Sequence, residues 1–227
     1  EDGVPYINLS GSISAEGYYL IERTDNDTVS DIAADLTAPF SGTGSGSGLS
    51  NSGEVLILSQ ASSTIDQTPS CVSAWCNAGS ATGFLTMERI EPDVSGTESS
   101  NWGSHNATVK NGKDAGGTAL AGTARARNSL NYLITTGANL SANKTLKKSK
   151  SPFIVKDGFT VNSGVTLTLE PGVVIKFYSG ESYLIGVGPI KALGADADKI
   201  IFTSFKDDAY GGDLNADAVS TTPAAQD

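Results

Sequence analysis

The stretch "VTLTLEPGVVIKFYSGESYLIGVGPIKALG", residues 165–194, decides the fold class. Apolar and polar residues alternate on both sides of the Pro171-Gly172 pair, and a period of two is typical of strands with one buried face. The Pro-Gly pair itself predicts a tight corner. We expect the inward-facing set to be Val165, Leu167, Leu169, Val173, Ile175 and Phe177, while Lys176 points outward.

Short strands separated by single corners favour a chain that winds into coils, whereas a hairpin meander would favour Asn-Gly-type turns. One coil cannot bury its own inner face, so this architecture has to repeat. Small residues recur on one parity near the end of the stretch, as expected where a side chain must pack against the next coil. This set is Gly188, Ile190, Ala192 and Gly194.

Three segments resemble the right-handed parallel β-helix of bacterial surface proteins. They are "SPFIVKDGFTVNSGVTLTLEPGVVIKF" (151–177), "GPIKALG" (188–194) and "IIFTSFKDDAYGGDLNADA" (200–218). The resemblance implies one and a half to two coils, fewer than the roughly three repeats that usually give independent stability. We therefore expect further chain, or a neighbouring molecule, to cover the end of these coils.

The N-terminal half also favours strands. Strand patterns follow turn residues in "ISAEGYYLIER" (13–23), "GEVLILS" (53–59) and "GFLTMERI" (83–90), and a Gly/Ser-rich loop occupies residues 41–53. The segment "SDIAADLTAPF" (30–40) has helical spacing of Ile32 and Leu36, but Pro39 limits any helix to one or two turns.

The order of these segments resembles the lamin-tail domain, an immunoglobulin-like β-sandwich of nuclear lamins and of bacterial surface and secreted proteins. The match includes "LSNSGEVLILSQASSTID", "TMERI" and the closing "GTARARNS". The family's opening strands are missing, so we expect an N-terminally incomplete domain. The predicted fold class is all-β, with a lamin-tail-like sandwich over residues 1–129, a linker over 130–150, and β-helix-like rungs with an acidic loop over 151–227.

Charge and hydropathy argue against a nucleic-acid surface and against a membrane span. The formal net charge is −10 and the chain is acidic, whereas a nucleic-acid surface needs clustered positive charge. The lysines of "SANKTLKKSK" (141–150) are interpreted as a solvated linker, with a nucleic-acid or anionic-lipid patch as the alternative. Apolar runs stay shorter than the roughly 18–20 residues that a membrane span needs, so we expect no membrane insertion.

Cys71 and Cys76 lie five positions apart in "CVSAWCNAG". A disulfide between them would close a small loop, provided that the chain turns there. The alternatives are two free thiols or a metal site, but His105, the single histidine, is remote from both. The secreted character of the composition favours the disulfide.

The segment "DDAYGGDLNADA" (207–218) carries the main candidate site. Five oxygen-bearing side chains fall within eleven residues, and the D-x-N-x-D spacing can present alternate side chains to one hard cation. The segment departs from an EF-hand loop because Ala218 stands in place of the glycine and no bidentate Glu follows. We predict a calcium site with the ligands Asp207, Asp208, Asp213, Asn215 and Asp217; the alternative is a solvated acidic turn. The segment "RTDNDTVSD" (23–31) is a poorer version of the same pattern.

Catalysis has weaker support. Carbohydrate-active β-helices need paired carboxylates, for which Asp207, Asp208 and Glu170 are the nearest candidates, but Glu170 sits at a corner and is interpreted as structural. His105 is expected in an exposed loop without a partner. We therefore predict no catalytic residues and no enzyme.

The sequence favours a non-catalytic structural or adhesive module of a large bacterial surface or secreted protein. Its expected location is extracellular or at the cell surface, and its expected partners are further copies, other surface proteins or polysaccharide. Filaments or a surface layer would follow if neighbouring copies cover the open ends. The alternatives are a polysaccharide lyase or hydrolase and a carbohydrate-binding module. For the last, the candidate aromatics are Tyr18, Tyr19, Tyr178, Tyr183 and Tyr210.

Overall fold

A computed structural model describes residues 6–40, 49–50, 52–71, 74–76, 83–132, 134–135 and 139–225. The chain divides into two compact units, Glu1–Leu130 and Asn131–Asp227. The described residues form an all-β protein, as predicted, because their helical segments are 3-10 turns of three residues.

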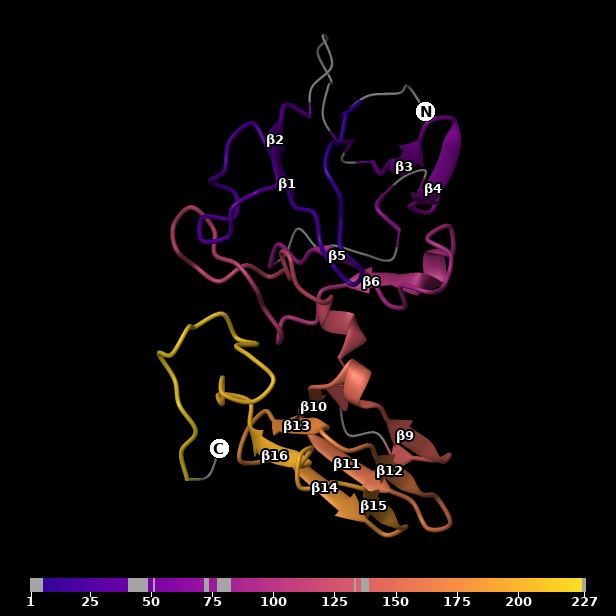
Figure 1. The fold of residues 1–227 in the computed structure, drawn as a ribbon, viewed down its shortest axis with the longest axis vertical. Helices are drawn as coiled ribbons and strands as arrows, with labels where there is room; N and C mark the ends of the chain where they lie inside the picture. Colours follow the sequence, from indigo (N-terminus) through magenta and orange to yellow (C-terminus); the bar gives the residue numbers. More distant parts are fainter. Residues whose placement is uncertain are drawn as a thin grey trace. The chain divides into compact units, whose positions relative to one another are not determined.

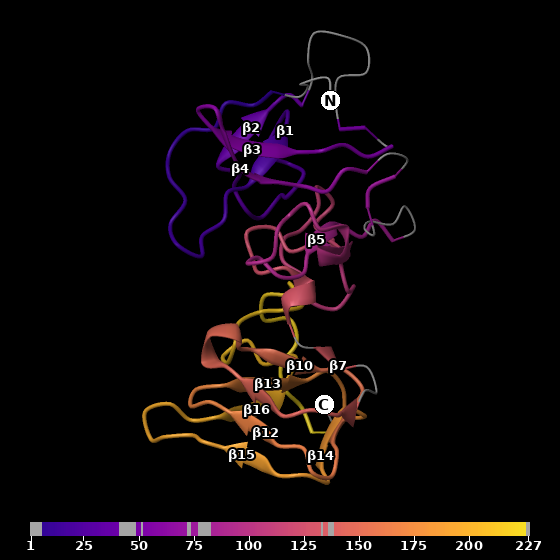
Figure 2. The ribbon, with the colours of Figure 1, turned by 90° about the vertical axis from the view of Figure 1, so that its right-hand side faces the viewer.

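The second unit consists of three parallel sheets (Figures 1 and 2). Each strand pairs in parallel with the strand three places later, so the chain visits the three sheets in turn. We call each passage through the three sheets a round. The strands of the first round are β7 (Ile134–Thr135), β8 (Asn139–Leu140) and β9 (Lys144–Leu146); those of the second are β10 (Phe153–Val155), β11 (Gly158–Val161) and β12 (Leu167–Leu169); those of the third are β13 (Val174–Phe177), β14 (Tyr183–Gly186) and β15 (Ile190–Ala192); and β16 (Ile201–Ser204) follows.

The segment predicted as a linker belongs to this second unit, which corrects the interpretation of residues 130–150. Strands β7, β8 and β9 all lie in it and pair with β10, β11 and β12. The short 3-10 turn η3 (Lys148–Lys150) then leads into β10. The exposed lysines made this segment look solvated, but Lys144 lies on β9, whose Leu146 is buried, and the other three follow that strand.

The core of the second unit lies between the three sheets and is built as the alternation predicts. Val165, Leu167, Leu169, Val173 and Ile175 are buried, and Phe177 packs against them partly buried. Lys176 is not part of this core cluster, as predicted, yet it is 0% exposed. The segment after β16 covers it, and its bonds to that segment are described below.

Two glycines explain why the corners are so tight. Gly172 has a φ of +80°, the left-handed conformation that the third position of a Pro-Gly turn requires. Its backbone N–H donates to the carbonyl of Asp198, 2.9 Å away, in the next round. At Gly188, a Cβ would lie 2.2 Å from the carbonyl oxygen of Val165, so only glycine fits there. This agrees with the small-residue parity predicted from the sequence.

The described residues of the first unit form three two-stranded sheets. Strand β1 (Ile21–Arg23) pairs in parallel with β2 (Leu36–Ala38), while β3 (Ile57–Gln60) with β4 (Ser63–Gln67) and β5 (Met87–Arg89) with β6 (Trp102–Ser104) are antiparallel; η1 (Ser99–Asn101) precedes β6, and η2 (Ser129–Asn131) follows at the unit's end. The helical prediction for residues 30–40 is wrong, because Leu36 pairs with Ile21 in a sheet. The immunoglobulin-like sandwich stays a prediction.

Buried polar side chains hold long irregular segments of the first unit in place. His105 is one of them, which corrects the expectation of an exposed loop histidine. Its Nδ1 accepts from the N–H of Ala107 at 3.0 Å, and its Nε2 bonds to the carbonyl of Val109. Both ring nitrogens thus close a local turn, and the pattern of a lone histidine in a polar segment could not reveal this.

Candidate metal centre

The candidate site follows β16, where the chain turns back over β13. Residues 213–217 alternate between partly buried oxygen-bearing side chains and buried apolar ones, and the apolar pair is Leu214 and Ala216. The oxygen-bearing side chains of this stretch are joined to one another, because the N–H of Asn215 donates to Oδ1 of Asp213 and its Nδ2 donates to Oδ2 of Asp217. The aromatic ring of Phe205 anchors the start of the segment 5.1 Å from that of Tyr178.

Three carboxylates converge in this segment. One oxygen each from Asp208, Asp213 and Asp217 lies within 4.8 Å of the others. Two oxygens bound to one calcium ion at about 2.4 Å can be at most about 4.8 Å apart, so the three carboxylates are close enough to share one ion. Of the five predicted ligands, the structure brings these three together as a carboxylate group.

Asp213 organises the backbone of the site. Its Oδ1 accepts from the N–H of Asn215 at 3.1 Å and its Oδ2 from the N–H of Ala218 at 2.8 Å. Ala216 and Ala218 have φ values of +56° and +64°, the region that glycine favours. The alanine that departs from the EF-hand pattern therefore still adopts the backbone conformation of the missing glycine.

Several oxygens in the site lack a partner although they are removed from solvent. They are Oδ1 and Oδ2 of Asp208, Oδ1 of Asn215 and Oδ1 of Asp217. The other atoms of the last two residues are engaged, because the Nδ2 of Asn215 donates to Oδ2 of Asp217 at 2.8 Å. A buried acceptor without a donor raises the free energy of the folded state. Four such oxygens in one segment would therefore be stabilised by a bound cation or by additional hydrogen-bond donors.

Asp207 does not join the group, which corrects its inclusion among the ligands. Its Oδ2 accepts from the hydroxyl of Thr203 on β16, and its Oδ1 accepts from the N–H of Ala209 at 3.1 Å. The sequence could not distinguish adjacent aspartates, because only the turn geometry decides which carboxylate bonds back to the strand.

Lys176 lies beneath the segment and was missed from the sequence. Its Nζ donates to the carbonyls of Gly212, at 2.6 Å, and Asp207, at 2.9 Å. The same side chain that is displaced from the core of β13 therefore holds both ends of the turn at residues 207–212. A lysine on the outer parity of a strand gives no sequence signal for this role, because the segment that covers it comes about thirty residues later.

The carboxylates of the site and the ammonium of Lys176 shift each other's pKa. Burial raises the pKa of Asp208, and the nearby carboxylates of Asp213 and Asp217 raise it further, while Lys176 partly offsets them. Burial lowers the pKa of Lys176, and Asp208, Asp207 and Asp213 counteract that shift. Three carboxylates against one ammonium leave a formal charge of −3 + 1 = −2, before the additional carboxylate of Asp207 is counted.

The other acidic candidates are engaged in local structure. Oε2 of Glu170 accepts from the N–H of Lys148 in the preceding round at 2.9 Å, so this carboxylate braces a corner as the sequence indicated. In the segment 23–31, Oδ1 of Asp25 accepts from the N–H of Asp27, and Oδ1 of Asp31 accepts from the N–H of Lys113 at 2.7 Å. Among the described residues, the only carboxylate group close enough for a shared ion is the one after β16.

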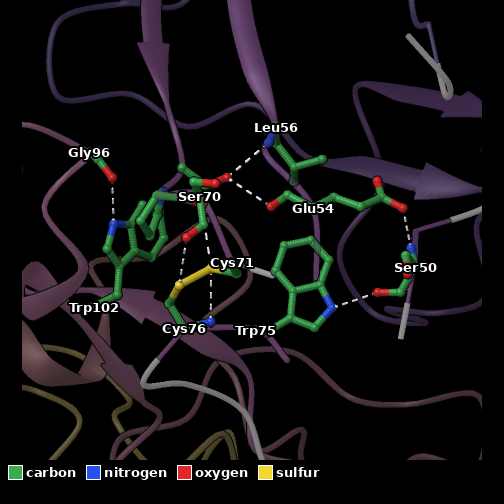
Figure 3. Close-up of a disulfide and its surroundings, with 11 residues drawn as sticks. Ser50, Glu54, Leu56, Ser70, Cys71, Trp75, Cys76, Gly96 and Trp102 are labelled. Atoms are coloured by element: carbon green, nitrogen blue, oxygen red, sulfur yellow. Dashed lines mark hydrogen bonds between the residues drawn. A yellow bond between two sulfur atoms is a disulfide. The ribbon is translucent and has the colours of Figure 1, made fainter. Parts of the chain in front are cut away.

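The predicted disulfide between Cys71 and Cys76 is present, with the Cα atoms 5.4 Å apart. Figure 3 shows its surroundings, which include both tryptophans of the chain. The indole Nε1 of Trp75 donates to the carbonyl of Ser50 at 2.9 Å, and that of Trp102 donates to the carbonyl of Gly96 at 2.8 Å. These bonds tie the disulfide region to two separate loops of the first unit.

Comparison with known proteins gives little guidance. No family model and no solved structure matches the chain. Protein bark beetle of Drosophila melanogaster is 30% identical over 98 residues, which is 43% of this chain and 3% of that protein. The chain thus corresponds to a small part of this relative, and the match identifies no family.

None of the helical segments in the described ranges has the length and apolar character of a membrane span.

Proposed function

We propose that this chain is a non-catalytic, extracellular structural module in which the second unit is part of a parallel β-helix and its open ends serve in assembly. The observation that carries the proposal is the regular succession of rounds, in which every strand stacks on the equivalent strand of the preceding round. Such a scaffold grows by adding rounds and presents its faces repeatedly, which suits surface architecture and adhesion.

The compartment and the interior of the scaffold support the same proposal. A disulfide is typical of oxidising compartments such as the outside of the cell, and Cys71–Cys76 is one. The space between the three sheets is lined by apolar side chains, namely Leu146, Phe153, Ile154, Val155, Phe159, Leu167, Ile175 and Leu184. This interior is thus a packed core, which supports a scaffold role for the unit.

The ends of the sheets favour self-association. Strands β14, β15 and β16 are the last of their sheets in the described structure, and β7, β8 and β9 are the first. Edge strands have unpaired N–H and C=O groups that recruit further strands. Pairing the last strands of one copy with the first strands of another is a head-to-tail contact, which extends into a filament when it repeats.

The assembly proposal predicts a loss of association when the edge is charged. Ile185 of β14 is 47% exposed, and Ile185→Lys would place an ammonium beside the strand edge. We expect the mean mass of the wild-type chain in light scattering to rise with concentration, while Ile185→Lys stays monomeric. Val219→Lys is the matched control, because Val219 is 78% exposed and lies outside the strands. A strictly monomeric wild-type chain at every concentration would remove the filament model.

The non-catalytic assignment has its own test against a carbohydrate-active enzyme. Purified chain is incubated with acidic polysaccharides in calcium, and new reducing ends or unsaturated products are measured. We expect product formation at the background rate, with wild type, Asp207→Asn and Asp208→Asn indistinguishable. Turnover by the wild type that either variant abolishes would replace the structural assignment with a lyase or hydrolase.

A further inference from the structure

We propose that the segment after β16 binds one calcium ion through Asp208, Asp213 and Asp217, with the side-chain oxygen of Asn215 as a further ligand. The site is independent of the assembly proposal, because it rests only on atoms within this segment and on Lys176. Calcium takes six to eight oxygen ligands, and waters would complete the set that these four side chains begin.

Two separate observations carry the assignment. The first is the convergence of three carboxylates within the span of one ion. The second is that both carboxylate oxygens of Asp208, and one oxygen each of Asn215 and Asp217, are covered from solvent yet accept no hydrogen bond. A solvated acidic turn explains the first observation but not the second, because a solvated carboxylate would keep its oxygens in water.

The charge balance favours a divalent cation. The three carboxylates and Lys176 sum to −2, and the nearby carboxylate of Asp207 adds one more negative charge, so a divalent ion offsets most of the charge of the segment. All four candidate ligands offer hard oxygen atoms, which calcium and magnesium prefer over softer metals. Magnesium needs near-ideal octahedral geometry and retains most of its waters, so a group of four protein ligands favours calcium.

Lys176 is a positioning residue for this site. Its ammonium already satisfies the carbonyls of Asp207 and Gly212, and so it fixes the turn that brings Asp208 toward Asp213. The proposed ion would bind the oxygens of Asp208, Asn215 and Asp217 that have no hydrogen-bond partner. One buried ammonium and one divalent ion would thus share the negative charge of the segment.

The decisive experiment combines calcium titration with an isosteric variant. Wild-type chain freed of metal with EDTA is titrated with CaCl₂ in a calorimeter, and melting temperatures are measured in EDTA and in CaCl₂. We expect one bound ion with a Kd of about 10⁻⁵ to 10⁻³ M. At a hundredfold excess over Kd, the melting temperature of the second unit should rise by about 10 °C. MgCl₂ at the same concentration should give a smaller rise.

Asp208→Asn separates a ligand from a structural residue. Its oxygens accept no hydrogen bond, so the change removes no partner and relieves repulsion from Asp213 and Asp217. In EDTA this variant should melt at or above the wild-type temperature, whereas in CaCl₂ it should melt below the wild type and bind at least tenfold more weakly. Asp196→Asn, an exposed change in the same unit, should respond to calcium like the wild type.

Three results would overturn the site. They are a wild-type titration without heat and with an unchanged melting temperature, equal calcium affinity of wild type and Asp208→Asn, and equal responses to calcium and magnesium. The wild-type titration decides the matter even if the variant fails to fold. The failure of this proposal is distinguishable from failure of the assembly model, because light scattering of Ile185→Lys does not involve these residues.

Discussion

Leu167→Ala is expected to destabilise the second unit by about 3–5 kcal/mol. Leu167 is 0% exposed on β12, the middle strand of its sheet, between Lys144 of β9 and Ile190 of β15. Truncation removes apolar contacts and leaves a cavity that strands fixed on both sides cannot close. The magnitude is therefore expected near the upper end of the range for buried leucines.

The experiment exploits the placement of the tryptophans. Both Trp75 and Trp102 belong to the unit Glu1–Leu130, so tryptophan fluorescence reports that unit, while far-UV circular dichroism reports both. In a urea titration, Leu167→Ala should lower the midpoint of the second unit's transition, which dichroism detects. The fluorescence transition of the first unit should not move. Leu193→Ala is the matched control, because Leu193 is 53% exposed and its loss should cost less than about 1 kcal/mol. Equal effects of the two variants would contradict the described core.

The residues of this core could be predicted from the sequence because strand alternation is a local property. A period of two fixes which side chains share a face, whatever the strands pair with later. The rounds themselves are less visible: Leu146, Leu169 and Ala192 occupy one register across β9, β12 and β15, but the lysines around Leu146 hide the first of these strands. A run of charged residues looks like a linker when only one side chain in it is buried.

In the candidate metal site too, contacts between residues near in the sequence could be predicted, whereas contacts between distant residues could not. The D-x-N-x-D spacing predicted the grouping of Asp213 and Asp217, because residues this near in the sequence meet within one local bend, here with Ala216 at a φ of +56°. The covering of Lys176 depends on a turn at residues 207–212. The exclusion of Asp207 depends on the hydroxyl of Thr203. Neither contact leaves a trace in the pattern of neighbouring residues.

The first unit contains a buried charged side chain that alternation alone would place at the surface. Glu88, the middle residue of β5, is 3% exposed. Its Oε1 accepts from the hydroxyl of Thr123 at 2.8 Å, and its Oε2 accepts from the hydroxyl of Ser129 and from the N–H of Leu130 at 3.3 Å. These donors lie 35 to 42 positions along the chain, so one carboxylate fixes the end of the long irregular segment against β5.

Glu88→Ala should therefore lower the free energy of unfolding of the first unit by about 3–5 kcal/mol, because the hydroxyls of Thr123 and Ser129 and the N–H of Leu130 all lose a charged acceptor. Glu88→Gln keeps one acceptor oxygen but turns an NH₂ group toward a donor. We therefore expect its free energy of unfolding to lie between those of the wild type and Glu88→Ala. The measurement is urea denaturation followed by tryptophan fluorescence, and the transition of the second unit should stay in place. Glu98→Ala serves as the control, because Glu98 is exposed and its side chain makes no capping bond at η1. If Glu88→Ala and Glu98→Ala unfold at the same urea concentration, the carboxylate does not hold this segment.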